Sequence, residues 1–394
     1  MSLWSKPVER IVQSDIETLI ANSVREGRTV EYKAEVPTNS DDDKREFLAD
    51  VSSFANASGG DILYGIEEHR DENRKPTGVP SAIAGLAGTN MDQAMLRLDG
   101  IIRDGIEPRI AGIRVNPVNT TNGPVLVIRV PKSYSAPHMV TFKNLSRFFS
   151  RTSNGKYQLD VTEIRSAFGL SEALPERIRR FRDERLGRII AGETVECPQD
   201  GPKVVLHLMP LSALELSSAV EVWQVGREPH RLPPMSARGW DGRYNFDGYL
   251  THNTRGNPPV CYSYTQLFRT GAVEAVDGLI LPGGQAQTRF PAPDVERQLL
   301  SATRNYLATL KLLDIQPPVV VMVTLVGVRG FYIIGPDSAY QAAIDRDTLL
   351  LPDLLVENLD DDPDVLMRPA FDALWQASGW RRCYSYDENG KRVH

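Results

Sequence analysis

Charged side chains alternate along a short stretch near the start of the chain. The letters TVEYKAE at residues 29–35 place Glu31, Lys33 and Glu35 two residues apart. Side chains two apart on a β-strand share one face, so the stretch predicts two carboxylates and an ammonium on one face of a strand. Convergent carboxylates can hold a divalent cation that activates water, and a lysine can neutralise charge developing on a phosphate. The alternative is an ordinary ion pair between Glu31 and Lys33, which contributes roughly a few tenths of a kcal/mol.

A helix and a tight turn follow this charged strand. Ser40 is a suitable N-cap, three aspartates occupy the first turn, and apolar residues recur at helical spacing up to residue 55. Gly59 and Gly60 then permit the positive φ that a sharp reversal of the chain requires. The sequence therefore predicts a strand–helix–strand unit over residues 29–68.

The second strand of this unit, residues 61–66, leads into two more acids, Glu67 and Glu68. If the two strands pair in parallel, the end of the second strand lies beside the end of the first. We therefore expect Glu67 or Glu68 to approach Glu31 or Glu35.

Four segments together resemble a known family. They are VEYK at 30–33, SFANASGG at 53–60, ILYGI at 62–66 and RFFSR at 147–151. Their order is similar to that of the Schlafen-type AlbA domain, which occurs in many bacterial proteins and in animal Schlafens. The resemblance covers roughly residues 10–190, in one copy, and implies a domain that binds RNA or DNA.

The resemblance also implies a chemistry. Animal Schlafens include endoribonucleases that cut structured RNA such as tRNA through a cluster of acidic residues in this fold. On this basis we expect a metal-dependent endoribonuclease site that uses Mg²⁺ or Mn²⁺, with a toxin or antiviral-defence role as its consequence. The candidate catalytic residues are Glu31, Lys33, Glu35, Glu67 and Glu68, the candidate metal ligands are Glu31, Glu35 and Glu68, and Asp71 is an alternative third acid.

Charge is unevenly distributed along the chain. The formal net charge is −6, which argues against a generic nucleic-acid binder. Residues 1–192 carry 27 Lys and Arg against 26 Asp and Glu, whereas residues 193–394 carry 18 against 25. Residues 129–188 alone, here called the basic band, carry 13 basic against 6 acidic residues. A phosphate backbone would be held there.

Arginines and phenylalanines interleave within the basic band. On a strand, Arg147, Phe149 and Arg151 share one face, the pattern that single-stranded nucleic acids use for phosphate contact and base stacking. Phe148, on the other face, is expected in the core, and the arginines could instead be solvated or paired. The candidate nucleic-acid contacts are Arg147, Phe149, Arg151, Lys143 and Lys156, together with Arg70, Arg74 and Lys75 of the charged loop 68–78, for which a simple solvated loop is the alternative.

The second half of the chain differs in character. Buried-strand runs at 203–210 and 318–326 and an amphipathic helix at 294–313 predict a separate acidic α/β domain. The chain as a whole is therefore predicted to be α+β, with a mixed-sheet domain at 1–192, a linker at 193–202 and the second domain at 203–394. Aromatic-rich strands in the second domain form a sheet core or, alternatively, line a ligand pocket.

Composition also bounds the compartment and the cofactors. Cys197, Cys261 and Cys383 are widely spaced and suit a reducing cytosol. No apolar run is long enough to span a membrane and the N-terminus lacks a signal-peptide core, so we expect a cytoplasmic protein. No Walker-type phosphate loop occurs, so ATP is not expected as a cofactor.

Three functions compete on this evidence. The first is the metal-dependent endoribonuclease. The second is a non-catalytic DNA- or RNA-binding regulator whose C-terminal domain senses a ligand or a protein partner. The third is a structural interaction protein, which is favoured if the basic band is paired internally. Animal Schlafens build a basic trough from two AlbA-type copies, so a single copy implies that a homodimer supplies the second.

Overall fold

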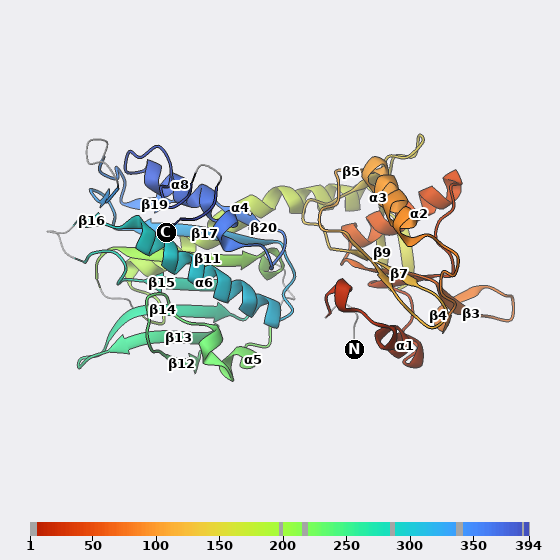
Figure 1. The fold of residues 1–394 in the computed structure, drawn as a ribbon, viewed down its shortest axis with the longest axis horizontal. Coiled ribbons are helices and arrows are strands. Elements are labelled where there is room, and N and C mark those ends of the chain that lie inside the picture. The colour runs from red at the N-terminus through yellow and green to blue at the C-terminus, as the bar shows by residue number, and fades with distance from the viewer. Residues whose placement is uncertain are drawn as a thin grey trace. The chain divides into compact units, whose positions relative to one another are not determined.

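The computed structural model describes residues 6–196, 200–214, 220–283, 288–335, 342–387 and 390–393. The chain divides into two compact units, residues 1–174 and 175–394 (Figure 1). The division falls inside one long helix, α4 (Val161–Ala191), and so precedes the linker predicted at 193–202, of which residues 197–199 lie outside the described part. Both units mix helices with strands, which confirms the predicted α+β class. No helix among the described residues combines the length and apolar character needed to cross a bilayer.

In the described part of the first unit, three α-helices, one short 3₁₀-helix and ten strands precede α4. In chain order they are η2 (Val8–Arg10), α1 (Gln13–Ala21), β1 (Val30–Lys33), α2 (Asp41–Asn56), β2 (Gly60–Tyr64), β3 (Ile66–Arg70), β4 (Pro76–Ile83), α3 (Met91–Gly105), β5 (Ile106–Glu107), β6 (Arg114–Val118), β7 (Val125–Val130), β8 (Met139–Val140), β9 (Arg147–Thr152) and β10 (Gly155–Gln158).

The central sheet of the first unit holds the predicted strand–helix–strand unit. Its strand order is β1-β2-β7-β6. Strands β1 and β2 pair in parallel, with Glu31 opposite Ile62. Strand β7 runs antiparallel to both β2 and β6. A parallel pair cannot be joined by a tight hairpin, and α2 supplies the required crossover.

The cap and the turn around α2 are also as predicted. The Ser40 hydroxyl accepts a hydrogen bond from the Asp43 backbone N–H at 3.1 Å. Gly59 has a φ of 73°, a value that favours glycine. A Cβ on Gly60 would lie 2.2 Å from the Phe54 ring, so only glycine fits where the chain enters β2.

Helix α2 packs between two sheets. One side of it joins Ile62 and Leu126 in the core of the central sheet. Its other side contacts β9 of a second sheet, ordered β10-β9-β8-β5. Strands β3 and β4 form a separate hairpin, labelled in Figure 1. The arrangement brings side chains of β1, α2 and β9 into one buried cluster.

The second unit is built on one eight-stranded antiparallel sheet, with the strand order β12-β13-β14-β15-β11-β17-β19 and with β20 also pairing β17. Its elements are β11 (Lys203–Pro210), η3 (Leu211–Leu214), α5 (Trp223–Gly226), η4 (Pro229–Arg231), β12 (Asp241–Tyr244), β13 (Gly248–Arg255), β14 (Val260–Phe268), β15 (Val273–Asp277), β16 (Arg289–Phe290), α6 (Ala292–Leu312), β17 (Val319–Val326), β18 (Tyr332–Ile333), β19 (Thr348–Leu350), β20 (Leu354–Val356), α7 (Pro363–Leu366) and α8 (Arg368–Gln376).

The C-terminal part of α4 is bound to this sheet through a buried acid, Glu274. Arg185 of α4 donates to both Glu274 oxygens at 2.8 Å, and the Tyr264 hydroxyl donates to the same carboxylate at 2.9 Å. His207 Nε2 lies 3.0 Å from it. Burial opposes ionisation, but the hydrogen bonds from Arg185 and His207 outweigh it and lower the pKa of Glu274 to about 2. Arg185, near the end of the basic band, therefore stabilises the fold of the second unit.

Candidate functional site

Glu31 of β1 lies in a buried ion pair. Lys33 Nζ is 2.9 Å from Glu31 Oε1, which realises the ion pair that was the alternative to catalysis. Arg151 of β9 donates from Nη2 to Glu31 Oε2 and from Nε to the Gly27 carbonyl oxygen at 3.0 Å. Burial raises the pKa of Glu31, but Lys33 and Arg151 outweigh it and hold that pKa below its ordinary value. Both oxygens of Glu31 thus face cations.

A second buried acid, Asp50 of α2, extends the pair into a network. Its side chain is 2% exposed, and the carboxylate lies 2.8 Å from Lys156 Nζ and 4.0 Å from Arg151 Nη1. The guanidinium of Arg151 also stacks over the Phe54 ring at 3.9 Å. Burial, reinforced by the nearby Glu31 charge, raises the pKa of Asp50 although Lys156 opposes it. We call Glu31, Lys33, Asp50, Arg151 and Lys156 the buried ion network.

Another acid lies beside this network at the base of the β3–β4 hairpin. Glu26 accepts a hydrogen bond from the Tyr32 backbone N–H at 2.6 Å. Burial, together with the charges of Glu31 and Glu68, raises the pKa of Glu26 to about 7. Glu68 itself accepts from the Gly78 backbone N–H at 2.8 Å. Glu68 therefore approaches Glu26, whose position the sequence did not single out.

The residues expected to bind Mg²⁺ or Mn²⁺ do not fit that role in this arrangement. Glu31 is saturated by cations, as described above. Glu35 is exposed in the loop after β1, Glu67 is exposed on β3, and Glu68 is used by the hairpin backbone. Within the described ranges, no three His, Cys, Asp or Glu side chains are placed to hold a metal ion. The alternative third acid, Asp71, instead caps the hairpin tip by accepting from the Lys75 backbone N–H at 2.8 Å.

The β9 residues expected to contact nucleic acid are divided by burial. Arg147 is exposed at the start of the strand. Phe149 packs against the core that includes α2, and Arg151 is 4% exposed. On this face of β9, Phe149 and Arg151 therefore point into the core, and only Arg147 at the start of the strand is exposed to solvent. Phe148, expected in the core, instead meets Phe168 edge to face at 6.1 Å between ring centroids.

The lysines expected to contact nucleic acid are engaged by acids. Lys143 Nζ lies 2.6 Å from Asp41 Oδ2. Lys156 binds both Asp50 and Glu46 and belongs to the buried ion network. Neither ammonium is available for a phosphate unless an existing ion pair is exchanged.

Several cations that have no acidic partner among the described residues lie around the β3–β4 hairpin. Arg70, Arg74 and Lys75 are exposed at its tip, where Arg70 Nη1 donates to the Arg74 carbonyl oxygen at 2.9 Å. Arg25 Nε donates to the Thr77 carbonyl oxygen at 3.3 Å, at the base of the same hairpin. Arg28, in the same loop as Arg25, donates from Nε to the Ser58 hydroxyl at 2.6 Å.

We call Arg25, Arg28, Arg70, Arg74 and Lys75 the hairpin surface. No carboxylate in the described part of the chain lies within 4 Å of any of these five charges, whereas Arg129, Lys143, Arg151 and Lys156 of the basic band are each paired with an acid. Sequence reasoning missed Arg25 and Arg28. Their only sequence signal is that they flank Gly27, immediately before the strand that carries Glu31.

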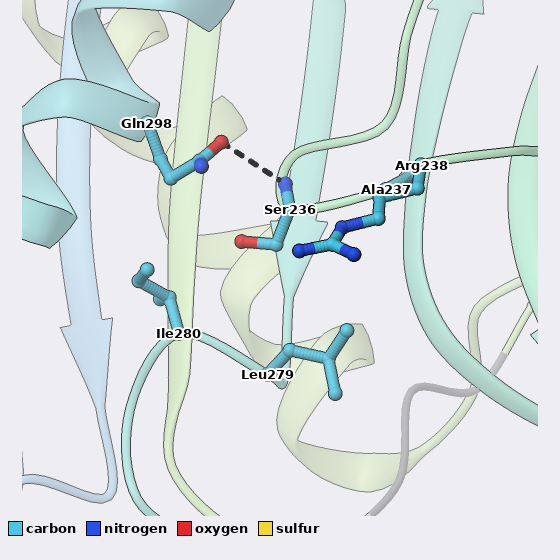
Figure 2. A pocket seen from close by; sticks show the side chains of 6 residues that line it. All are labelled: Ser236, Ala237, Arg238, Leu279, Ile280 and Gln298. Carbon is cyan, nitrogen blue, oxygen red and sulfur yellow. Dashed lines mark hydrogen bonds between the residues drawn. The ribbon is translucent and has the colours of Figure 1, made fainter.

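The second unit contains a pocket of about 380 Å³, lined by Ser236, Ala237, Arg238, Leu279, Ile280 and Gln298. Figure 2 shows the Arg238 side chain extending toward Ser236. The Ser236 backbone N–H donates to Gln298 Oε1 at 3.2 Å, which leaves the Gln298 amide nitrogen as a donor. The Ser236 hydroxyl is buried beside the Asp277 carboxyl, and its hydrogen bond to that carboxyl opposes the rise that burial causes in the pKa of Asp277. A second pocket of about 290 Å³ shares Ser236 and adds Trp240.

Comparison with known proteins places the first unit in a family. A model of the Schlafen AlbA_2 family matches residues 26–160. Curated proteins give no match. Among solved structures, the N-terminal domain of a protein from Nitrosomonas europaea described as related to the ATP-dependent DNA helicase RecG matches 31% of this chain and 74% of that one, at 17% identity and a TM-score of 0.24. The DIP2311 protein from Corynebacterium diphtheriae matches 37% of this chain at 19% identity and a TM-score of 0.24, over only 26% of its own length. On the family match, the chain carries a Schlafen-type AlbA_2 domain at residues 26–160.

Proposed function

We propose that the first unit binds nucleic acid through the hairpin surface, and that the buried ion network maintains the fold of the domain. The observation that carries the proposal is the contrast between the two sets of cations. None of the five charges of the hairpin surface has a carboxylate within 4 Å in the described part of the chain. In the basic band, by contrast, most cations lie in ion pairs, namely Arg129, Lys143, Arg151, Lys156, Arg179, Arg182, Arg185 and Arg188. Membership in the Schlafen AlbA_2 family supports nucleic acid as the ligand.

The chemistry of the hairpin surface suits a flexible phosphate backbone. Its charges come from one loop and one projecting hairpin, so they can contact successive phosphates without reading bases. Glu26 lies beneath the surface with a pKa of about 7, so below that pH it adds no negative charge to repel a polyanion. We therefore expect the first unit to bind nucleic acid more tightly at pH 6 than at pH 8 when both are measured at the same salt concentration.

A salt titration tests the binding proposal. Fluorescence anisotropy of labelled single-stranded RNA, single-stranded DNA and duplex DNA is followed as salt rises, for the wild-type chain and for the triple variant R70Q/R74Q/K75Q. Each phosphate contact contributes about 0.7 to the slope of log K against log salt for single strands, so losing three lowers the slope by about 2. Lys143→Gln is the matched control, because Lys143 is already paired with Asp41. Equal affinity and slope in the triple variant would contradict the proposal.

Metal-dependent RNA cleavage is the competing activity, and the same protein can be used to test it. Incubation of tRNA with Mg²⁺, Mn²⁺ or EDTA should leave the RNA intact if the unit only binds. Glu35→Gln and Glu67→Gln are the informative variants, because both acids are exposed and neither belongs to the buried ion network. Cleavage that needs metal and disappears in these variants would replace binding with catalysis, and only then would a toxin or defence role follow.

For the second unit we propose that the pocket at Ser236 binds a small organic anion. Two donors converge there, the Arg238 guanidinium and the Gln298 amide. Leu279 and Ile280 supply an apolar wall. The buried carboxyl of Asp277 shapes that wall by accepting from the backbone N–H of Leu279 at 2.6 Å and of Ile280 at 3.0 Å. Burial raises the pKa of Asp277, which favours its uncharged form and weakens repulsion of an anion.

Thermal unfolding of the full chain tests this second proposal. Adenosine monophosphate, inorganic phosphate and benzoate serve as probes that separate a phosphate head, a phosphate alone and a carboxylate with an apolar body. At least one should raise the unfolding temperature of the second unit, and Arg238→Gln should abolish the rise. Arg238 is exposed, so the variant should fold. If none of the three probes shifts the transition, the pocket does not bind this class of ligand.

A further inference from the structure

Strand β12 forms an open end of the sheet in the second unit. It is the first strand in the order, and only β13 pairs with it among the described residues (Figure 1). All four of its residues, from Asp241 to Tyr244, are exposed. An edge strand presents unpaired N–H and C=O groups that another strand can join.

The hairpin that joins β12 to β13 shows which backbone groups point outward. Asn245 and Gly248 exchange two hydrogen bonds, of 3.0 and 3.3 Å. In an antiparallel pair such hydrogen-bonded positions recur every second residue, so Arg243 and Asp241 also bond to β13. The N–H and C=O groups of Gly242 and Tyr244 therefore face away from the sheet.

Charge selects one register for two such edges about a two-fold axis. With Gly242 opposite Gly242 of a second copy, the outward groups bond, and Asp241 lies opposite Arg243 of that copy on both sides of the axis. With Gly242 opposite Tyr244 instead, the two Arg243 side chains lie opposite each other, which is destabilising. The first register forms two ion pairs from the two charged residues of the strand.

The side chains that this register requires are accessible. Asp241 is exposed and has no ion-pair partner in the described part of the chain. Arg243 is half exposed and uses one nitrogen, Nη2, for Glu196 at 2.5 Å, so the rest of its guanidinium can reach a second carboxylate. Beside the edge, Phe246 is 94% exposed and Tyr244 55%, which adds apolar surface for a partner to cover.

We infer that β12 pairs antiparallel with β12 of a second copy, centred on Gly242, so that one sheet continues across two chains. The inference concerns the second unit alone and does not depend on nucleic-acid binding by the first. It provides a physical route to the homodimer that the single AlbA-type copy led us to expect.

Light scattering and sedimentation of the full chain over a wide concentration range test this inference. The wild type should be a dimer. Asp241→Arg and Arg243→Asp should each raise the dimer dissociation constant by at least about tenfold, which corresponds to about 1.4 kcal/mol. The double variant D241R/R243D restores opposite charges across the axis and should recover the dimer. Circular dichroism and thermal unfolding verify that each variant folds, and Asp241→Arg is the safest because it breaks no ion pair.

Three results overturn the inference. One is a wild-type chain that stays monomeric at every concentration. Another is a dimer that persists unchanged in Asp241→Arg, since its interface must then lie elsewhere. Failure of the double variant to recover dimerisation while both single variants are monomeric would also exclude the Gly242-centred register.

Discussion

Removing Arg151 is the sharpest test of the buried ion network. Its side chain is 1% exposed, and it pairs with a Glu31 side chain that is 12% exposed. Removing one partner of a buried pair typically costs about 3–5 kcal/mol, because the other charge stays buried without compensation. Arg151→Met also leaves the Gly27 carbonyl oxygen without its hydrogen bond. We expect Arg151→Met to cost about 4 kcal/mol, and the double variant E31Q/R151M to cost about 2 kcal/mol less than the two single changes together.

Amide hydrogen exchange read by mass spectrometry is the suitable assay. Tryptophan fluorescence would report mainly the second unit, because the tryptophans are Trp4, Trp223, Trp240, Trp375 and Trp380. Peptides from β1 and α2 report the first unit within the full chain. A loss of 3–4 kcal/mol would speed their exchange by a factor of about a hundred to a thousand. Arg147→Gln is the control, since Arg147 lies on the same strand but is exposed, and it should leave exchange unchanged.

The opposite pattern would refute the reasoning. If Arg151→Met preserved protection in β1 and α2 but weakened RNA binding, Arg151 would be a ligand contact and the network would not support the fold. The same logic affects any use of Glu31→Ala to test catalysis. That change leaves Arg151 and Lys33 without their shared anion, so lost activity could follow from unfolding.

Three further predictions concern pH and packing. The pKa of Glu26 rises to about 7 on folding, so the stability of the first unit should fall as pH rises from about 4.5 to 7. The expected loss is about 1–2 kcal/mol after solvent screening. Glu26→Gln should remove this pH dependence when stability is measured by hydrogen exchange. The pKa of Glu274 is lowered to about 2, so the stabilisation of the second unit by this carboxylate should be complete above pH of about 4.5 and lost as pH falls toward 2. At neutral pH, Glu274→Gln should lower the stability of the second unit by about 3 kcal/mol. Tryptophan fluorescence during urea unfolding measures this loss. Gly60→Ala should destabilise the first unit by about 2 kcal/mol in the hydrogen-exchange assay, because the new Cβ would overlap the Phe54 ring. Gly100→Ala is the control, because the space around Gly100 is open. It should be neutral or stabilising by up to about 1 kcal/mol.

Local signals predicted the elements well. The Ser40 cap and the Gly59–Gly60 turn are set by neighbours in sequence, and both appear as expected. In the second unit, the runs at 203–210 and 318–326 correspond to β11 and β17, because a continuous β-branched stretch has few other places to be buried. These features depend on short-range chemistry that the sequence displays directly.

The site was less predictable, because it depends on which face of a strand points inward. A period of two places Arg147, Phe149 and Arg151 on one face but does not say whether that face meets water or α2. An arginine is usually exposed, so the sequence favoured a surface role for Arg151. Its burial requires Glu31 from β1 and Asp50 from α2 as partners, and only the tertiary packing brings those acids to it.

The buried ion network also explains why β9 keeps the strand register that turns Arg151 toward α2. Sliding β9 by one residue would turn Arg151 outward and point a hydroxyl residue, Ser150 or Thr152, at Glu31 and Asp50. Two buried acids would then lack their shared arginine, at a cost of several kcal/mol. An apolar residue at position 151 would tolerate such a slip far better, so the arginine contributes specificity of pairing as well as stability. A domain organised in this way keeps its acids neutralised in the interior and leaves the exposed cations around the hairpin to meet a polyanion.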